Sequence, residues 1–214
     1  MSLEERTLFG GKNKVDVAID RLRAFEPPEG YLLAFSGGKD SALAAVLLSR
    51  DYEVELNTFV FSAGQDSASA RKAADILGFP WKKRIFEQGF LERIANMVVA
   101  CGYPNEAILE VHRHALAMLC REYSVIADGT RLDDQVPVLS RDEVRSLQDR
   151  IGCAYVRPLL GYGWHEVNRL AERYFVTATG ETGEIESSDY ERWIREALRD
   201  RGLDILSFFP RGHR

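Results

Sequence analysis

The sequence predicts an α/β protein built as an open parallel-sheet sandwich, and two observations support this prediction. Short apolar runs alternate with longer segments of helical apolar spacing along the chain, a pattern typical of βαβ units around a parallel sheet. One apolar run, ending at Phe35, passes through two glycines directly into a helical pattern. With 45% hydrophobic residues, the 214-residue chain can also bury a substantial core.

The first part of the chain alternates helices and strands. Residues 15–25 have apolar side chains at helical spacing, and Pro27-Pro28 stop this helix. The apolar run 31–35 is the first expected strand, and 41–50 is the helix after it. Residues 53–61 become apolar towards their end, as in a buried strand, and the helix expected at 66–77 ends at Gly78.

The second part continues this alternation. A short strand is expected at 81–86, and two helical patterns, 90–100 and 107–122, are separated by a loop with Gly and Pro. The later expected elements are strands at 124–127 and 154–156 and helices at 141–151, 164–174 and 188–201. We expect three parts: an N-terminal helical segment (1–28), the sheet domain (29–178) and a C-terminal helical extension with a tail (179–214).

Composition favours a cytoplasmic enzyme. No apolar run approaches the roughly 18 residues that a membrane span needs, and the N-terminus has no apolar region of a secretory signal. The three cysteines are odd in number and widely spaced, which argues against a disulfide framework. The net charge of −5 does not favour binding a long nucleic acid, although basic clusters matter more than the total charge.

Residues 36–41 read SGGKDS and lie between the first expected strand and its helix. A strand that enters a helix through a tight glycine turn points backbone N–H groups and the positive helix end at one spot. Glycines let the backbone turn sharply and approach a ligand closely. The two serine hydroxyls and the lysine ammonium add donors there. This segment therefore predicts a phosphate-binding loop.

The spacing of this loop differs from two common phosphate loops, GxxxxGK[ST] and GxGxxG. SGGKDS after a strand instead resembles the PP-loop of the ATP pyrophosphatases, a superfamily that includes GMP synthetase, NAD synthetase and the tRNA thiouridylases. The overall pattern is nearest to small archaeal-type PP-loop ATPases related to the thiouridylases. The resemblance implies an adenine nucleotide alpha hydrolase-like fold, ATP and Mg²⁺ as cofactors, and cleavage of ATP to AMP and pyrophosphate.

The resemblance also implies which residues bind ATP. Those around the loop are Ala34, Phe35, Ser36, Gly37, Gly38, Lys39, Asp40 and Ser41. The second strand of such folds ends beside the adenine, which selects Val60, Phe61 and Ser62. Residues 124–130, SVIADGT, resemble the turn that borders the ATP site in GMP synthetases and thiouridylases, and this adds Gly129 and Thr130.

Charged residues near these segments are candidates for metal binding and catalysis. Mg²⁺ binds through one or two carboxylates plus substrate phosphates, and the candidate ligands are Asp40, Asp133 and Asp134. Lys39 and Asp40 are also catalytic candidates. We expect Arg131 and Arg157 to stabilise the charge of the departing pyrophosphate. Arg157 opens RPLL, which with residues 166–171 resembles a late thiouridylase motif whose lysine is replaced here by His165.

We expect Ser36, Ser62, Asp128 and Arg157 to face one crevice, because each follows an expected strand. Cys101 lies in an expected loop before a helix, where thiouridylases have a sulfur-handling cysteine. Such a cysteine reacts as a thiolate, and Cys153 is the plausible second thiol. Cys120 lies in a helical run and reads as core.

The sequence leaves three functions open. The first is adenylation of a tRNA base for thiolation, with ATP, tRNA and a sulfur-donating protein as partners. The second is ammonia-dependent amidation or ligation of a small acid, with ammonia supplied by a partner protein. The third is a non-catalytic nucleotide-binding subunit. A homodimer is compatible with each of these functions, and no membrane partner is expected.

Overall fold

The computed structural model describes residues 31–131, 133–134, 138–174 and 190–209 of the chain. The helix expected at 15–25 lies outside these residues. The described part contains a five-stranded sheet with strand order β3-β2-β1-β4-β5, in which each strand is parallel to its neighbours. The strands are β1 (Tyr31–Ala34), β2 (Val54–Val60), β3 (Trp81–Ile85), β4 (Val125–Ala127) and β5 (Ala154–Val156). The α/β fold with a parallel sheet is therefore confirmed.

The helices agree with the expected segments to within a few residues at each end. They are α2 (Lys39–Leu48), α3 (Ala68–Leu77), α4 (Phe90–Cys101), α5 (Asn105–Cys120), α6 (Arg141–Ile151), α7 (Trp164–Ala171) and α8 (Tyr190–Asp200), with a short 3-10 turn at Ile205–Ser207. Helix α6 begins where expected because the Ser140 hydroxyl accepts the Glu143 N–H, and the Glu143 carboxylate accepts the Ser140 N–H.

The order of the strands reverses at β1. This strand lies between β2 and β4, and its Leu33 is in register with Leu56 on one side and Ala127 on the other. After β3 the chain passes through α4 and α5 and returns as β4 on the far side of β1. Connections from the carboxyl ends of β1 and β4 therefore diverge, and ligands of open α/β sheets bind at such a switch point.

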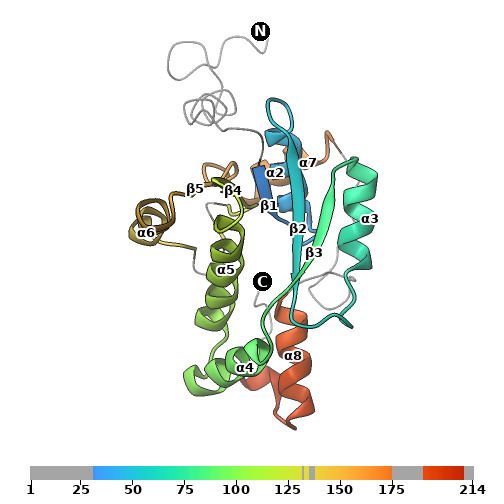
Figure 1. Cartoon of the computed structure of the whole chain (residues 1–214). Helices are drawn as coiled ribbons and strands as arrows, with labels where there is room; N and C mark the ends of the chain where they lie inside the picture. Colours follow the sequence, from blue (N-terminus) through green and yellow to red (C-terminus); the bar gives the residue numbers. More distant parts are fainter. Residues whose placement is uncertain (1–30, 132, 135–137, 175–189, 210–214) are drawn as a thin grey trace.

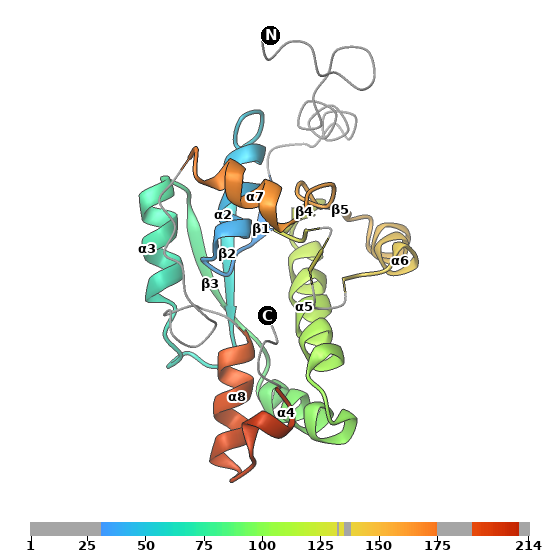
Figure 2. The ribbon, with the colours of Figure 1, turned by 180° about the vertical axis from the view of Figure 1, so that it is seen from behind.

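Helices cover both faces of the sheet. Side chains alternate along β1, so that Leu33 packs in the cluster with α2, α3 and α7, whereas Ala34 packs in the cluster with α4, α5 and α8. Figure 2 shows α2 and α7 in front of the strands, and Figure 1 shows the sheet from the opposite side. The result is a three-layer sandwich.

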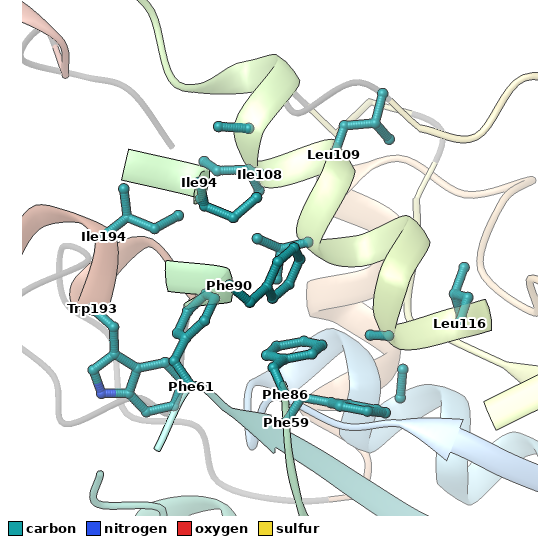
Figure 3. Packing of buried hydrophobic residues seen from close by; sticks show 14 of the residues in the cluster. Phe59, Phe61, Phe86, Phe90, Ile94, Ile108, Leu109, Leu116, Trp193 and Ile194 are labelled. Atoms are coloured by element: carbon teal, nitrogen blue, oxygen red, sulfur yellow. The ribbon is translucent and has the colours of Figure 1, made fainter. Parts of the chain in front are cut away.

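The core on the α4/α5/α8 face is rich in aromatic rings (Figure 3). Phe61 contacts Phe86 with ring centroids 5.2 Å apart and Trp193 of α8 at 6.1 Å in an edge-on arrangement. Trp193 and Phe209 are both buried, and α8 packs beside α4. Burying one large apolar side chain contributes about 1.5–3 kcal/mol. The C-terminal helix is therefore an integral part of this core.

Cys120 at the end of α5 and Cys153 just before β5 form a disulfide, with their Cα atoms 5.4 Å apart. Both residues are buried. Two sequence-based expectations were thus wrong: the protein has a disulfide, and Cys153 is the partner of Cys120 and not of Cys101. The fold brings α5 and β5 together across 33 residues of sequence, a proximity that cysteine spacing does not reveal.

Within the described ranges, the helices are too short or too polar to cross a bilayer.

Candidate functional site

The loop between β1 and α2 has the backbone that a phosphate loop requires. Gly37 adopts a left-handed φ of +82°, and a Cβ there would lie 2.8 Å from the Cα of Ala70. Only glycine satisfies both conditions. Gly38 precedes α2 and its carbonyl accepts the first helical hydrogen bond, from the Ala42 N–H. The N–H groups of the first turn of α2 therefore have no partner within the helix.

The two serines at the ends of the loop hold it in shape. The Ser36 hydroxyl accepts the N–H of Gly38 at 3.2 Å and lies 3.3 Å from the hydroxyl of Ser41. The Ser41 hydroxyl donates to the carbonyl of Gly38 at 3.0 Å. These short-range bonds fix both hydroxyls beside the helix N-terminus, which is a favourable site for an anion.

The turn after β4 packs directly on this loop. A Cβ on Gly129 would lie 2.6 Å from the backbone nitrogen of Ser41 and 2.8 Å from the carbonyl carbon of Asp40. This contact is closer than any side chain permits, so glycine brings the β4 turn against the first turn of α2. The expected contact of Gly129 with the nucleotide stays a prediction, and the structure shows this glycine against the backbone of α2.

A cavity of about 240 Å³ opens beside the loop. It lies at the carboxyl ends of β1, β2 and β4, on the α5/α8 side of the sheet. Residues expected from the sequence that line it are Ala34, Phe35, Ser36, Asp40, Ser41, Gly129, Thr130 and Asp134. Asp128, which was expected to face this crevice, also lines it, and the additional lining residues are Phe59, His112 and Tyr190. The lining therefore combines polar side chains with the aromatic residues Phe35, Phe59 and Tyr190.

A network of opposite charges borders the loop. The Lys39 ammonium lies 2.7 Å from Oδ1 of Asp40, and Nε of Arg131 lies 3.1 Å from Oδ2 of the same carboxylate. The Arg131 side chain also donates to Oδ1 of Asp134 at 2.7 Å. Its third nitrogen, Nη1, is buried and has no hydrogen-bond partner in the described part of the chain. The Arg131 guanidinium thus contacts two carboxylates that line the cavity, and its Nη1 remains without a hydrogen-bond partner among the described residues.

The three candidate metal ligands are not equivalent. Asp40 and Asp134 line the cavity, whereas Asp133 accepts the N–H of Trp164 at 2.8 Å at the start of α7. No group of three or more acidic, histidine or cysteine side chains that could hold a metal occurs among the described residues. Two carboxylates are enough to bind an Mg²⁺ ion that is also bound to nucleotide phosphates, because such an ion takes its other ligands from phosphate and water.

Asp128 is the buried centre of a side-chain network that the sequence did not reveal. Its Oδ2 accepts hydrogen bonds from the Tyr155 hydroxyl and from Nε2 of His112 at 2.6 Å, and its Oδ1 accepts the Thr130 N–H at 3.0 Å. Burial by itself raises the pKa of Asp128. The hydrogen bond and charge of His112 lower this pKa, as do the hydrogen bonds from Tyr155 and Thr130, and their combined effect is larger, so the pKa lies below its ordinary value. Burial, followed by the adjacent Asp128 charge, raises the pKa of Tyr155 well above its ordinary value.

Several expected site residues lie outside the cavity lining. Val60 and Phe61 belong to the aromatic core, and Ser62 is exposed in the loop after β2, where its N–H donates to Gln65. Arg157 donates to the carbonyl of Leu139 and lies over the ring of Tyr155. Asp128 and Ser36 therefore share the crevice, as expected, whereas Ser62 and Arg157 do not line it.

Cys101 is exposed, has a free thiol and is the last residue of α4 rather than part of a loop. It is not among the residues that line the cavity. Gly102 follows with a left-handed φ of +70° and ends the helix. The structure therefore does not bring Cys101 and the phosphate loop together in one pocket.

Known proteins resemble this chain over most of its length. "Uncharacterized protein MJ0690" of Methanocaldococcus jannaschii is 41% identical over 177 residues, which are 82% of this chain and 88% of that protein. A crystal structure from the same organism, described as a "predicted subunit of tRNA methyltransferase", is 39% identical, covers 85% of this chain and 92% of its own, and has a TM-score of 0.78.

A more distant structure shares the fold. The NH3-dependent NAD synthetase of Campylobacter jejuni is 18% identical over 91% of this chain and 86% of its own, with a TM-score of 0.52. A family model described as "Family of unknown function (DUF7411)" matches residues 30–214. This match spans the whole sheet, the SGGKDS loop and α8, and the chain therefore belongs to the DUF7411 family.

Proposed function

We propose that this protein binds ATP in the cavity beside the SGGKDS loop and cleaves it to AMP and pyrophosphate, so that an acceptor is adenylated. The observation that carries this proposal is the joint packing of two glycine turns. Gly37 lies against Ala70, and Gly129 lies against Ser41, so that the β1–α2 loop and the hydroxyls of Ser36 and Ser41 border the same cavity. This arrangement suits the charged phosphates of a nucleotide.

The chain's own residues have distinct roles in this proposal. The first turn of α2 and the hydroxyls of Ser36 and Ser41 bind the pyrophosphate end of ATP. Lys39 and Arg131 offset the negative charge that grows on the departing pyrophosphate, and the unpaired Nη1 of Arg131 is a donor available for this task. Asp40 and Asp134 would hold Mg²⁺, which supplies charge neutralisation when bound.

An RNA base is the acceptor that we favour. The support is the related protein of 39% identity described as a "predicted subunit of tRNA methyltransferase", together with the resemblance of the loop to the tRNA thiouridylases. In this role the protein is an adenylating transferase with tRNA as its partner. Cys101 remains the candidate sulfur carrier, although it does not line the cavity.

Amidation of a small acid is the second candidate, because the chain shares its fold with an NH3-dependent NAD synthetase. The name of that enzyme states its dependence on ammonia, but a shared fold alone is not evidence of a shared reaction. A non-catalytic nucleotide-binding subunit is the third candidate. It accounts for the loop and the cavity but gives no role to the Lys39, Asp40 and Arg131 network.

Product analysis tests these alternatives. Purified protein is incubated with Mg²⁺ and ATP labelled at the α-phosphate, either alone, with bulk unmodified tRNA, or with small carboxylic acids and ammonia. Free or RNA-bound AMP that appears only with tRNA supports adenylation of RNA, and AMP that appears with small carboxylic acids supports amidation. Release of ADP contradicts the assignment of the loop. Tight ATP binding without any product indicates a nucleotide-binding subunit.

The Cys101→Ser variant separates thiolation from the other reactions. A sulfur-carrying role predicts that adenylation of tRNA, measured as pyrophosphate release, continues, while sulfur transfer to tRNA and the AMP release that accompanies it are lost. Because Cys101 is exposed at a helix end, serine should be tolerated there without loss of folding. Full retention of sulfur transfer would exclude a role for this thiol.

A further inference from the structure

Three members of the buried network, His112, Asp128 and Thr130, line the cavity, and His112 is the more exposed side chain of the His112–Asp128 pair. This histidine lies in the middle of α5 and lines the cavity together with Phe59 and Tyr190. Its side chain is 24% exposed, whereas that of Asp128 is only 4% exposed. One end of the imidazole is therefore fixed inside the protein, and the ring borders the space in which a substrate would lie.

The hydrogen bonds of Asp128 determine which ring nitrogen carries the proton. An ionised carboxylate can only accept hydrogen bonds, and Asp128 accepts from Tyr155 and Thr130 as well as from His112. Nε2 of His112, 2.6 Å from the carboxylate, must therefore be the protonated nitrogen. In the neutral ring, Nδ1 then carries the lone pair, and it has no hydrogen-bond partner within the described residues.

Three different elements hold this geometry. Asp128 follows β4, Tyr155 lies on β5 and His112 lies on α5. The Cys120–Cys153 disulfide joins the same helix to the residue that precedes β5. A histidine that only filled space would not need a buried carboxylate that accepts three hydrogen bonds. The arrangement is instead typical of a catalytic acid or base, in which a carboxylate holds one ring nitrogen and the other nitrogen faces the substrate.

We propose that His112 is the general base of the adenylation step and that Asp128 and Tyr155 are its positioning residues. This inference rests on the proposed function and narrows its substrate class. The acceptor is a lactam of a nucleobase in RNA, in which the attacking carbonyl oxygen is conjugated to a ring N–H. A carboxylate acceptor is already ionised at neutral pH and would need no base for this step.

The step is balanced without any further reactant. The lactam oxygen forms a bond to the α-phosphorus of ATP, and the bond from that phosphorus to the oxygen bridging to the β-phosphorus breaks. Pyrophosphate leaves with the electron pair of the broken bond. The ring N–H proton of the lactam passes to Nδ1 of His112. Asp128 stabilises the resulting imidazolium through the Nε2–H bond, and the proton later returns to solvent.

Isotope exchange between labelled pyrophosphate and ATP isolates this first step, because it does not require the later attack by sulfur or ammonia. With bulk unmodified tRNA as the acceptor, His112→Gln should lower the exchange rate by about a hundredfold, in the range typical of a lost general base. Gln keeps a donor near Asp128 but cannot take up the proton. Exchange supported by small carboxylic acids and not by tRNA would overturn the proposal.

His114→Gln is the matched control. His114 lies on the same helix two residues away, is partnered by Glu87 at 2.7 Å, and does not line the cavity. Its substitution should leave exchange unchanged. His112→Ala should regain part of its exchange when imidazole is added, which a purely structural role does not predict. Equal exchange in His112→Gln and the wild type would contradict the proposal.

The pH profile gives a second readout. A general base acts only in its unprotonated form, so wild-type exchange should fall towards acidic pH, and His112→Gln should lack this dependence. The other titratable side chains that line the cavity are Asp40, Asp128, Asp134 and Tyr190. Because these remain in the variant, an acidic decrease of the same size in His112→Gln would assign the effect to them and overturn the role of His112.

One measurement does not depend on activity. Long-range ¹H–¹⁵N spectra of the histidine side chains show which ring nitrogen carries the proton in the full chain. We expect the Nε2–H form for His112, and the Nδ1–H form would overturn the proposal even if no acceptor is found. Absence of AMP and of exchange in the wild type with every acceptor contradicts the proposed function itself, so the two failures are distinguishable.

Discussion

Gly129 lies so close to Ser41 that a Cβ on the glycine would be 2.6 Å from the serine backbone nitrogen. The turn after β4 and the start of α2 are thus held together by backbone contact alone. This contact borders the cavity, which Ser36, Ser41, Gly129 and Thr130 line. Changes at Gly129 should therefore affect nucleotide binding as well as stability.

We predict that Gly129→Ala destabilises the protein by about 1–3 kcal/mol, as other overpacked sites do, and weakens ATP binding more than about tenfold. The added methyl group must displace backbone atoms of α2, which no side-chain rotation can relieve. Thermal unfolding and calorimetric titration with ATP measure the two effects. Gly161→Ala is the control, since a Cβ there meets no atom within 4 Å. Unchanged ATP binding in Gly129→Ala would contradict the proposed position of the phosphates.

Gly37→Ala tests the other glycine turn. Its φ of +82° costs a side chain about 1–2 kcal/mol, and the new methyl group would also lie 2.8 Å from the Cα of Ala70. Gly89→Ala has the same backbone penalty, with φ +81° and no atom within 4 Å of the new Cβ. The difference in unfolding free energy between the two variants therefore measures the close approach alone. We expect only Gly37→Ala to lose ATP affinity. Equal losses of stability in Gly37→Ala and Gly89→Ala would show that the backbone at Ala70 shifts to accommodate the new methyl group.

The fold and the position of the glycine loop could be predicted because their signals are local. The strand–glycine–helix pattern at 31–48 and the capping residues around α6 lie within a few positions of the elements that they determine. His112 could not be found in this way. A single histidine in an amphipathic helix has no distinguishing pattern, and its partner Asp128 is 16 residues away.

The adenine contacts and the disulfide depend on packing that no local pattern reveals. Phe59, rather than Val60 or Phe61, lines the cavity, and Phe61 instead packs against the rings of Phe90 in α4 and Trp193 in α8. Contact of Val60, Phe61 and Ser62 with adenine stays a prediction. Cys120 was correctly expected to be buried, but its bond to Cys153 follows from the meeting of α5 and β5.

Reduction of the Cys120–Cys153 disulfide should destabilise the protein. In the chain-entropy model, a bridge between residues 33 apart in sequence contributes about 3–4 kcal/mol. We expect dithiothreitol to lower the melting temperature of the wild type but not that of the Cys120→Ser/Cys153→Ser double variant. Cys101→Ser should keep the wild-type response, because Cys101 is free. A wild type that is insensitive to full reduction would contradict a stabilising bridge.

Asp128 should make stability depend on pH in the acid range. Its pKa is lowered in the folded protein below the ordinary value of about 3.9, so the unfolded chain binds the proton more readily. The stabilisation is thus present above about pH 4 and is lost as the pH falls through the folded-state pKa. Denaturant unfolding across this range should show a steeper acid loss for the wild type than for Asp128→Asn. Asp128→Asn should also be less stable at neutral pH, since it lacks the charge that pairs with His112.

Tyr155 should produce the opposite dependence in the alkaline range. Its pKa is raised in the folded protein above the ordinary value of about 10, so the unfolded chain releases this proton first. The stabilisation is present below about pH 10 and is lost as the pH rises through the folded-state pKa. Tyr155→Phe removes the hydroxyl and should lack this part of the alkaline loss. Tyr123→Phe, at an exposed site, should keep it, and equal alkaline profiles for the wild type and Tyr155→Phe would contradict burial of the hydroxyl against Asp128.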